Sequence, residues 1–287
     1  MRKYLVYLFL IFLPLSAELY NLSVVSFIHN EARFLKEWIE FHKLTGVEHF
    51  YLFNHLSEDH YLEVLEPYIE DGTVELFDWP YPFESIITWN SIQCKAYQKI
   101  VKERAHETKW LAIIDSDEFL FSPETDDIKE ILKEFENFGG VGVNWQMYGT
   151  SHVPKVGEDQ LMVEMLVYKA EENHAHNFFV KSIVQPKCVK AITNPHYCKY
   201  KPQFFQVNEN KERFENRRSP YVSVNKLRIN HYWTRDEDFL YNVKIPRSKI
   251  FWRQKENVVL ERNEQYNKVM DQAVSHLIPK LHMEVLK

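Results

Sequence analysis

Apolar and polar positions follow two alternating patterns along most of this chain, one typical of strands and the other of helices. Four short runs are largely apolar, as buried strands are: residues 22–28, 49–53, 74–77 and 110–114. Three segments repeat apolar residues every three or four positions, as amphipathic helices do: residues 34–42, 61–69 and 91–106. Strands that alternate with helices form parallel sheets through right-handed crossovers. We therefore predict an α/β fold with a mainly parallel sheet flanked by helices.

The second half of the chain continues the pattern less clearly. Residues 128–138 are expected to form a helix, 141–145 a strand, and 161–168 either a strand or a helix. Residues 248–286 are largely helical in pattern and highly charged. We therefore expect one domain over residues 18–247 and a helical C-terminal extension, residues 248–287, that packs on it.

Residues 1–17 differ from the rest of the chain. Arg2 and Lys3 precede an apolar run, and Pro14, Ser16 and Ala17 follow it. This order is typical of a secretory signal peptide, and the run is shorter than the ~20 residues of a spanning helix. Residues 1–17 are therefore interpreted as a signal peptide or a short uncleaved membrane anchor. Either alternative predicts an exported or membrane-associated protein.

Composition excludes several classes of function. The chain has 7 glycines in 287 residues, and none forms the glycine-rich loops of dinucleotide-binding or P-loop proteins. Its formal charge of −6, without a long basic run, argues against nucleic-acid binding. The cysteines Cys94, Cys188 and Cys198 lack zinc-site spacing. Cys188 and Cys198 are close enough in sequence to form a disulfide, and buried free thiols are the alternative.

Candidate chemistry lies at the end of the most apolar run, where Asp115, Asp117 and Glu118 follow residues 110–114. In open α/β sheets, ligands bind at the carboxyl ends of the strands. Residues two apart in an extended chain point the same way, so Asp115 and Asp117 are expected to present two carboxylates to one site. Oxygen ligands of this kind suit Mg²⁺ or Mn²⁺, which neutralises a departing phosphate.

Two other interpretations of this motif remain. An acidic cluster after a strand can cap the next helix or face solvent. The motif also resembles the phosphotransferase pattern D-x-D-x-[TV], in which the first aspartate is a nucleophile. Phe119 occupies the position of the Thr or Val, which argues against that chemistry.

Several segments with distinctive motifs follow one another along the chain: FIHNE at 27–31, residues 35–42, 46–52, 65–68 and 71–75, KWLAIIDSDEF at 109–119, residues 144–145 and 148–152, KSIVQP at 181–186, His196, and INHY at 229–232. Together, and in this order, they resemble the blocks of glycosyltransferase family 92 and its relatives within the family 2-like group. The resemblance covers roughly residues 22–247. It implies a GT-A fold over residues 18–247 and a metal-dependent glycosyltransferase. The implied reaction moves a sugar, most plausibly galactose from UDP-galactose, to a glycan acceptor.

The resemblance also implies roles for individual residues. Asp115 and Asp117 correspond to the family's D-x-D motif, with Asp117 on Mn²⁺ (or Mg²⁺) and Asp115 on the metal or the ribose. Glu31 corresponds to a glutamate near the nucleotide. After the second strand, such proteins commonly have an aspartate-asparagine pair, and this chain departs from that pattern with NHLSED at 54–59. Asn54 and Asp59 are the candidates for nucleotide contact there.

The remaining candidates come from residue chemistry. Five of them are assigned to the donor, the metal and the acceptor: Lys181 for the donor diphosphate, His231 for the metal, and Trp145, His152 and His196 for the acceptor. An inverting transfer needs a carboxylate base, for which Glu164 and Glu118 are candidates. Each also has an ordinary structural interpretation. The alternative for the whole protein is an exported glycan-binding or host-interacting protein that keeps the fold without turnover.

Overall fold

The computed structural model describes residues 18–82 and 85–286. The predicted signal peptide or anchor, residues 1–17, lies outside the described residues. The strands are β1 Tyr20–Ile28, β2 His49–Asn54, β3 Val74–Asp78, β4 Thr108–Ile113, β5 Glu118–Phe121, β6 Gly140–Met147, β7 Tyr168–Lys169, β8 Val180–Val184, β9 Val189–Asn194, β10 Tyr197–Tyr200, β11 Gln206–Val207, β12 Arg228–His231 and β13 Val269–Met270. The α-helices are α1 Ala32–Leu44, α2 Tyr61–Glu70, α3 Ile86–Glu103, α4 Ile128–Leu132, α5 Met162–Met165, α6 Glu237–Phe239, α7 Ile245–Phe251, α8 Glu256–Tyr266 and α9 Ile278–Val285.

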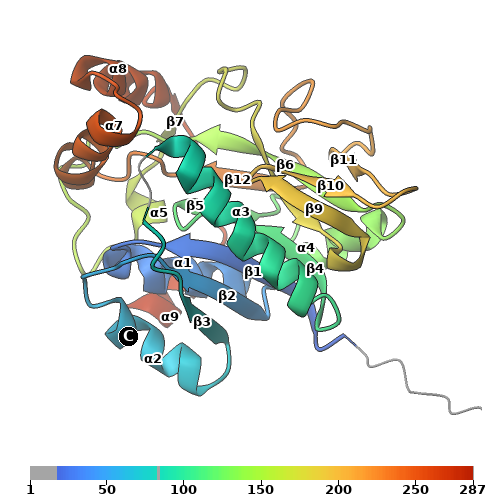
Figure 1. Cartoon of the computed structure of the whole chain (residues 1–287). Coiled ribbons are helices and arrows are strands. Elements are labelled where there is room, and N and C mark those ends of the chain that lie inside the picture. Colours follow the sequence, from blue (N-terminus) through green and yellow to red (C-terminus); the bar gives the residue numbers. More distant parts are fainter. Residues whose placement is uncertain (1–17, 83–84, 287) are drawn as a thin grey trace, which may run out of the picture.

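A single curled sheet organises the molecule (Figure 1). Its strands follow the order β3-β2-β1-β4-β8-β6-β12-β5, and β11 pairs with β6. The first four are parallel neighbours, while β8 is antiparallel to both β4 and β6, and β5 is antiparallel to β12. The expected α/β class with a mainly parallel sheet and flanking helices is confirmed.

Both faces of the central strands are buried because their residues alternate between two apolar layers. Val24 and Ala112 face the layer that includes α1, while their neighbours Val25 and Ile113 face the layer that includes α3. Figure 1 shows α3 crossing one face of the sheet, and α1, α2 and α9 on the other side. This two-sided burial explains why the strands are largely apolar.

The local predictions differ from the structure mainly at element ends. Helix α3 begins at Ile86, five residues before the expected start, because the Ser85 side chain caps it by accepting a hydrogen bond from Thr88 N. Residues 128–138 form the short α4 followed by a 3-10 turn at Lys133–Phe135. The ambiguous segment 161–168 contains the short helix α5.

Two further findings concern the segments left open by the sequence. Cys188 and Cys198 are buried free thiols, so the alternative without a disulfide is the one observed.

In the C-terminal part, α9 contacts α1, where Lys36 Nζ donates to the Val285 carbonyl at 2.6 Å. Across the described ranges, we find no helix whose length and apolar content suffice to cross a membrane.

Candidate functional site

A cleft of about 410 Å³ lies where β1, β4, β6 and β12 end. These four strands run in the same direction, so their carboxyl ends meet at one edge of the sheet. Three carboxylates among the described residues line the cleft: Glu31, Asp115 and Asp117. The sequence-based expectation that Asp115 and Asp117 share one site at a strand end agrees with this placement.

The backbone reason given for that expectation is wrong. Residues 115–118 form a turn, in which Glu118 N donates to the Asp115 carbonyl at 3.1 Å, and are not extended. Tyr232 N donates to the Asp117 carbonyl at 2.9 Å and ties the turn to the end of β12. The two carboxylates therefore reach the same cleft but have different partners.

Asp115 is paired with a buried lysine. Lys181 Nζ, on β8, lies 2.8 Å from Asp115 Oδ2 and 3.6 Å from Glu118 Oε2. Burial disfavours the charged ammonium, but the two carboxylates outweigh it and raise the pKa of Lys181. Lys181 does not line the cleft, so the structure places it behind Asp115 and away from the space expected for a diphosphate.

Glu118 is fully buried, and its role differs from the expected one. Its Oε2 accepts a hydrogen bond from Asp115 N at 2.9 Å. Burial, followed by the neighbouring Asp115 and Asp117 charges, raises the pKa of Glu118 well above its usual range despite Lys181. Because this carboxyl does not line the cleft, Glu118 stabilises the turn and does not meet an acceptor hydroxyl.

Asp117 faces cationic and imidazole groups from the second half of the chain. Its Oδ1 lies 3.3 Å from His231 Nε2, and its Oδ2 lies 3.7 Å from Lys244 Nζ. Burial raises the pKa of Asp117, but His231, Lys244 and Arg235 outweigh it and lower that pKa strongly. Asp117 is therefore ionised. Burial also lowers the pKa of Lys244 to about 8, against the opposing effect of Asp117.

Glu31, just after β1, pairs with the buried Arg235. The guanidinium of Arg235 lies against the edge-to-face pair of Phe34 and Phe239, at 4.2 and 4.6 Å from their centroids, and its Nη2 donates to the Ser116 carbonyl at 3.4 Å. Burial raises the pKa of Glu31, and the charge of Arg235 opposes that effect. Arg235 thus joins Glu31 to the acidic turn, a role that the sequence analysis missed.

These residues partly fit a divalent cation. Asp117 Oδ1 and His231 Nε2 are 3.3 Å apart and both residues line the cleft, which gives one oxygen and one nitrogen ligand. Asp115 is held by Lys181 instead. Within residues 18–82 and 85–286, no cluster of three or more His, Cys, Asp or Glu side chains is arranged to hold a metal. A cation here would need oxygen ligands from a bound substrate.

Two of the three expected acceptor residues line the cleft. The Trp145 ring lies 4.4 Å from the His231 ring and 5.2 Å from the His196 ring, centroid to centroid. Burial, followed by the charge of Lys181, lowers the pKa of His196 to about 3, so this imidazole is neutral. His152 is exposed at a positive-φ position outside the cleft, which argues against the predicted acceptor contact.

Three other sequence-based candidates lie outside the cleft. Glu164 is exposed on α5, and its Oε2 lies 2.8 Å from His282 Nε2 on α9, which argues against a role as catalytic base. Asn54 Nδ2 donates to the Tyr61 hydroxyl at 2.8 Å. Asp59 Oδ2 accepts a hydrogen bond from Ala32 N at 2.8 Å and caps α1. Asn54 and Asp59 therefore hold local structure in place of the expected nucleotide contacts.

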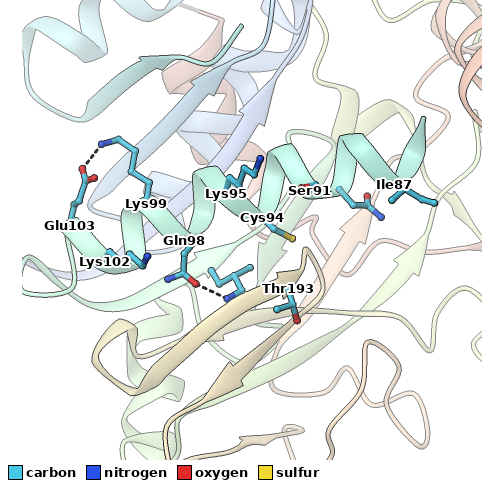
Figure 2. Close-up of a pocket in the computed structure, with 11 residues that line it drawn as sticks. Ile87, Ser91, Cys94, Lys95, Gln98, Lys99, Lys102, Glu103 and Thr193 are labelled. Carbon is cyan, nitrogen blue, oxygen red and sulfur yellow. Dashed lines mark hydrogen bonds and ion pairs between the residues drawn. The ribbon is translucent and has the colours of Figure 1, made fainter. Parts of the chain in front are cut away.

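A second hollow, of about 810 Å³, runs along α3 and β9 (Figure 2). Gln98 Oε1 accepts the backbone N–H of Ile192 at its floor. Among the described residues, Glu103 is the one carboxylate that lines this hollow, and it is paired with Lys99. No described residue brings a second carboxylate or an imidazole to this hollow, so the smaller cleft is the candidate active site.

The fold and the cleft define an α/β protein with an acidic turn at the carboxyl edge of its sheet. A sequence profile of glycosyltransferase family 92 matches residues 22–274, and the chain belongs to that family. Similar curated proteins include family 92 members from Ricinus communis (24% identity over 253 residues, 83% of this chain, 40% of the relative) and Oryza sativa subsp. japonica (24% over 252 residues, 83% and 38%). The chain thus spans about two fifths of the length of these relatives.

Solved structures with a similar arrangement include the crystal structure of S. aureus TarS 1–349. It has a TM-score of 0.41 and 14% identity, over 83% of this chain and 68% of that chain. The same protein in complex with UDP-GlcNAc has a TM-score of 0.39 and 12% identity, over 58% of this chain and 46% of that chain.

Proposed function

We propose that this chain transfers a sugar from a nucleotide-diphosphate sugar to a glycan acceptor. The observation that carries the proposal is the acidic turn itself: Asp115 and Asp117 line one cleft at the carboxyl ends of parallel strands, beside Lys244. Membership in family 92 supports the same reaction class. From the sequence resemblance, the donor is UDP-galactose. Export or membrane association through residues 1–17 is part of the proposal and rests on the sequence pattern.

The transfer breaks the bond between the anomeric carbon of the donor sugar and the phosphate oxygen. A hydroxyl oxygen of the acceptor forms the new bond to that carbon, and its proton passes to a base. The nucleoside diphosphate leaves with the electron pair of the broken bond. Lys244 and Arg247 line the cleft and supply positive charge for this leaving group. A protein base would be one of the two cleft carboxylates other than Asp117, which are Glu31 and Asp115.

Asp117 and His231 are the residues that would hold Mn²⁺ or Mg²⁺. When bound, such an ion supplies further positive charge to stabilise the departing diphosphate. The chain's own contribution is to keep Asp117 ionised next to His231 and Lys244. Lys181 and Glu118 hold Asp115, at the start of the turn, in place.

Thermal-shift measurements with UDP-galactose, other nucleotide-diphosphate sugars and UDP, each with and without Mn²⁺, test this proposal. A ligand that binds only the folded state raises its melting temperature. We expect the largest rise with UDP-galactose and Mn²⁺, loss of that rise in Asp117→Asn, and retention in the control Asp159→Asn. Asp159 is exposed and outside the cleft. No shift with any nucleotide under either condition would refute the proposal.

A further inference from the structure

The later segments of the chain line their part of the cleft with aromatic and imidazole rings. Phe179 is at the centre, with ring centroids 5.5 Å from Trp145, 5.7 Å from His196 and 6.2 Å from His176. Tyr266, on α8, is 1% exposed and adjoins this surface, with its ring centroid 6.0 Å from that of His176. All five residues line the cleft. We call this surface the ring wall. Aromatic faces of this kind suit the apolar faces of sugar rings.

Three arginines border the ring wall, and two of them, Arg217 and Arg262, line the cleft; the third, Arg218, lies 5.0 Å from the Phe179 centroid outside the cleft lining. The guanidinium of Arg217 lies 5.6 Å from the Phe179 ring centroid, and that of Arg262 lies 5.1 Å from the Trp233 centroid. Trp233 in turn lies 6.2 Å from Tyr266. Of the two that line the cleft, Arg217 is exposed and Arg262 is half-buried. The cleft therefore presents two guanidinium groups beside the surface that suits a sugar.

Neither arginine has a carboxylate partner among residues 18–82 and 85–286. Arg262 Nη1 has only a long hydrogen bond, 3.5 Å, to the Gln254 side chain, and Arg217 has its cation–π contact. The three carboxylates that line the cleft are each engaged by another cation: Glu31 by Arg235, Asp115 by Lys181, and Asp117 by Lys244. Two arginines thus remain available to a ligand that brings its own negative charge.

A second observation at the same wall indicates a polar ligand. Trp145 is 9% exposed and lines the cleft, and its indole Nε1 has no hydrogen-bond partner in the described part of the chain. A buried donor without a partner is costly, and a ligand oxygen in the cleft would satisfy it. Sugar hydroxyls supply such an oxygen next to a ring face.

The ring wall adjoins the expected donor site, since Lys244 and Arg262 lie 4.5 and 5.1 Å from the centroid of the same Trp233 ring. The charge of Arg247 lowers the pKa of Glu31, near the end of β1, and the charge of Lys244 lowers the pKa of Asp117, near the end of β4. The charge of Arg262 instead affects His176. Burial, and after it this charge, lowers the pKa of His176 to about 4. Lys244 and Arg247 are the cations nearest the acidic turn, whereas Arg217 and Arg262 border the ring wall, where a second anion would meet them.

We propose that the ring wall is the acceptor subsite and that it takes a glycan carrying negative charge, with Arg217 and Arg262 bound to the anionic groups. This inference rests on the proposed function, since it names the acceptor class of that reaction. The shared chemistry is an anionic oxygen cluster on a sugar, as in a carboxylate, a sulfate ester or a phosphate ester. Guanidinium groups bind all three through paired N–H donors.

Direct binding tests the inference without turnover. The probes are a galacturonic acid trimer, a neutral galactose trimer, and sulfated and phosphorylated forms of the neutral trimer, titrated calorimetrically with and without saturating UDP and Mn²⁺. UDP binding is measured separately and reports on the proposed function. We expect at least one anionic trimer to bind about tenfold or more tightly than the neutral one, a difference of about 1.4 kcal/mol. Comparison of the galacturonic acid, sulfated and phosphorylated trimers identifies whether a carboxylate, a sulfate ester or a phosphate ester binds most tightly.

Variants locate the effect. In Arg217→Gln/Arg262→Gln, the preference for the anionic trimer should fall to about twofold or less while UDP affinity stays unchanged. The matched control is Arg213→Gln, because Arg213 is exposed, is paired with Glu215 and lies outside the cleft. Arg217→Lys/Arg262→Lys keeps the charge and should retain part of the preference. Equal binding of neutral and all anionic trimers would overturn the inference, and so would an equal loss of UDP affinity in the double Gln variant.

Discussion

Lys181 Nζ lies 2.8 Å from Asp115 Oδ2, with the lysine side chain 1% exposed. The same ammonium is 3.6 Å from Glu118 Oε2, so one buried cation holds both ends of the acidic turn. This pairing fixes Asp115 from behind and leaves Asp117 to face His231 and Lys244. Both aspartates line the cleft, but Asp115 is held by a buried lysine, whereas Asp117 faces the imidazole and the ammonium of the later segments.

Lys181→Met should destabilise the protein, because it leaves Asp115 and Glu118 close together without their cation. Breaking a buried pair by removing one partner typically costs about 3–5 kcal/mol. We expect about 3 kcal/mol in urea unfolding at neutral pH, since Asp115 is 34% exposed and partly solvated. The control is Lys187→Met, whose ammonium is exposed and 3.5 Å from Glu18. It should change stability by less than about 0.5 kcal/mol.

A second variant keeps this test informative. Glu118→Gln added to Lys181→Met removes one of the two unpaired carboxyls, so the double variant should recover part of the lost free energy of unfolding. A Lys181→Met variant as stable as Lys187→Met would contradict the account of the pairing.

The pH dependence of stability should include a contribution from Glu37 on α1. Its carboxyl accepts backbone hydrogen bonds from Met162 at 2.8 Å and Val163 at 2.9 Å, and burial raises its pKa from 4.5 to about 7 in spite of them. The folded state therefore binds more protons than the unfolded state between these pH values. The contribution of this group is fully present below pH 4.5 and is lost as pH rises through about 7.

The free energy of unfolding should thus fall between pH 4.5 and pH 7 more in the wild type than in Glu37→Gln. At about 1.4 kcal/mol per pKa unit, the excess fall is up to about 3 kcal/mol. Urea unfolding at half-unit pH steps measures it. The exposed Glu63→Gln should reproduce the wild-type profile. Parallel profiles for wild type and Glu37→Gln would rule out this assignment.

The C-terminal extension should unfold together with the rest of the chain. Leu281 on α9 is fully buried in the same apolar cluster as Trp38 on α1. Leu281→Ala should lower the free energy of unfolding of the whole protein by about 2–5 kcal/mol in one transition. Met283→Ala, at a side chain 56% exposed, should have little effect. A separate early transition that involves only the C-terminal helices would show that residues 248–287 fold independently.

The first half of the fold was predictable from sequence because β1, β2 and β4 are buried on both faces and are therefore largely apolar. Strands β8 and β12 gave no such signal. Each carries buried polar side chains, Lys181 on β8 and Asn230 on β12, that serve the cleft and its surroundings. Apolar periodicity cannot reveal a strand whose interior positions are occupied by charged and amide groups.

The site was predictable only in its local part. Asp115 and Asp117 are adjacent to an apolar strand, so sequence proximity was enough to pair them. Arg235 and Arg262 are more than a hundred residues further along, among 35 Lys and Arg residues. Nothing in their neighbours distinguishes them from exposed charges, and only the tertiary fold brings them to the cleft. Glu164 was misassigned because its apolar neighbours Val163 and Met165 face inward from a short helix that leaves Glu164 exposed.

Sugar transfer from UDP-galactose in the presence of Mn²⁺ tests the proposed glycosyltransferase activity most directly. It is measured as UDP release with a panel of neutral and anionic glycans, in wild type and Asp117→Asn. We predict acceptor-dependent UDP release by the wild type and a decrease of about a hundredfold or more in the variant, with its fold retained by circular dichroism. Equal rates in the two proteins would contradict the account. So would glycan binding by the wild type without any UDP release, which is the behaviour of a glycan-binding protein without turnover.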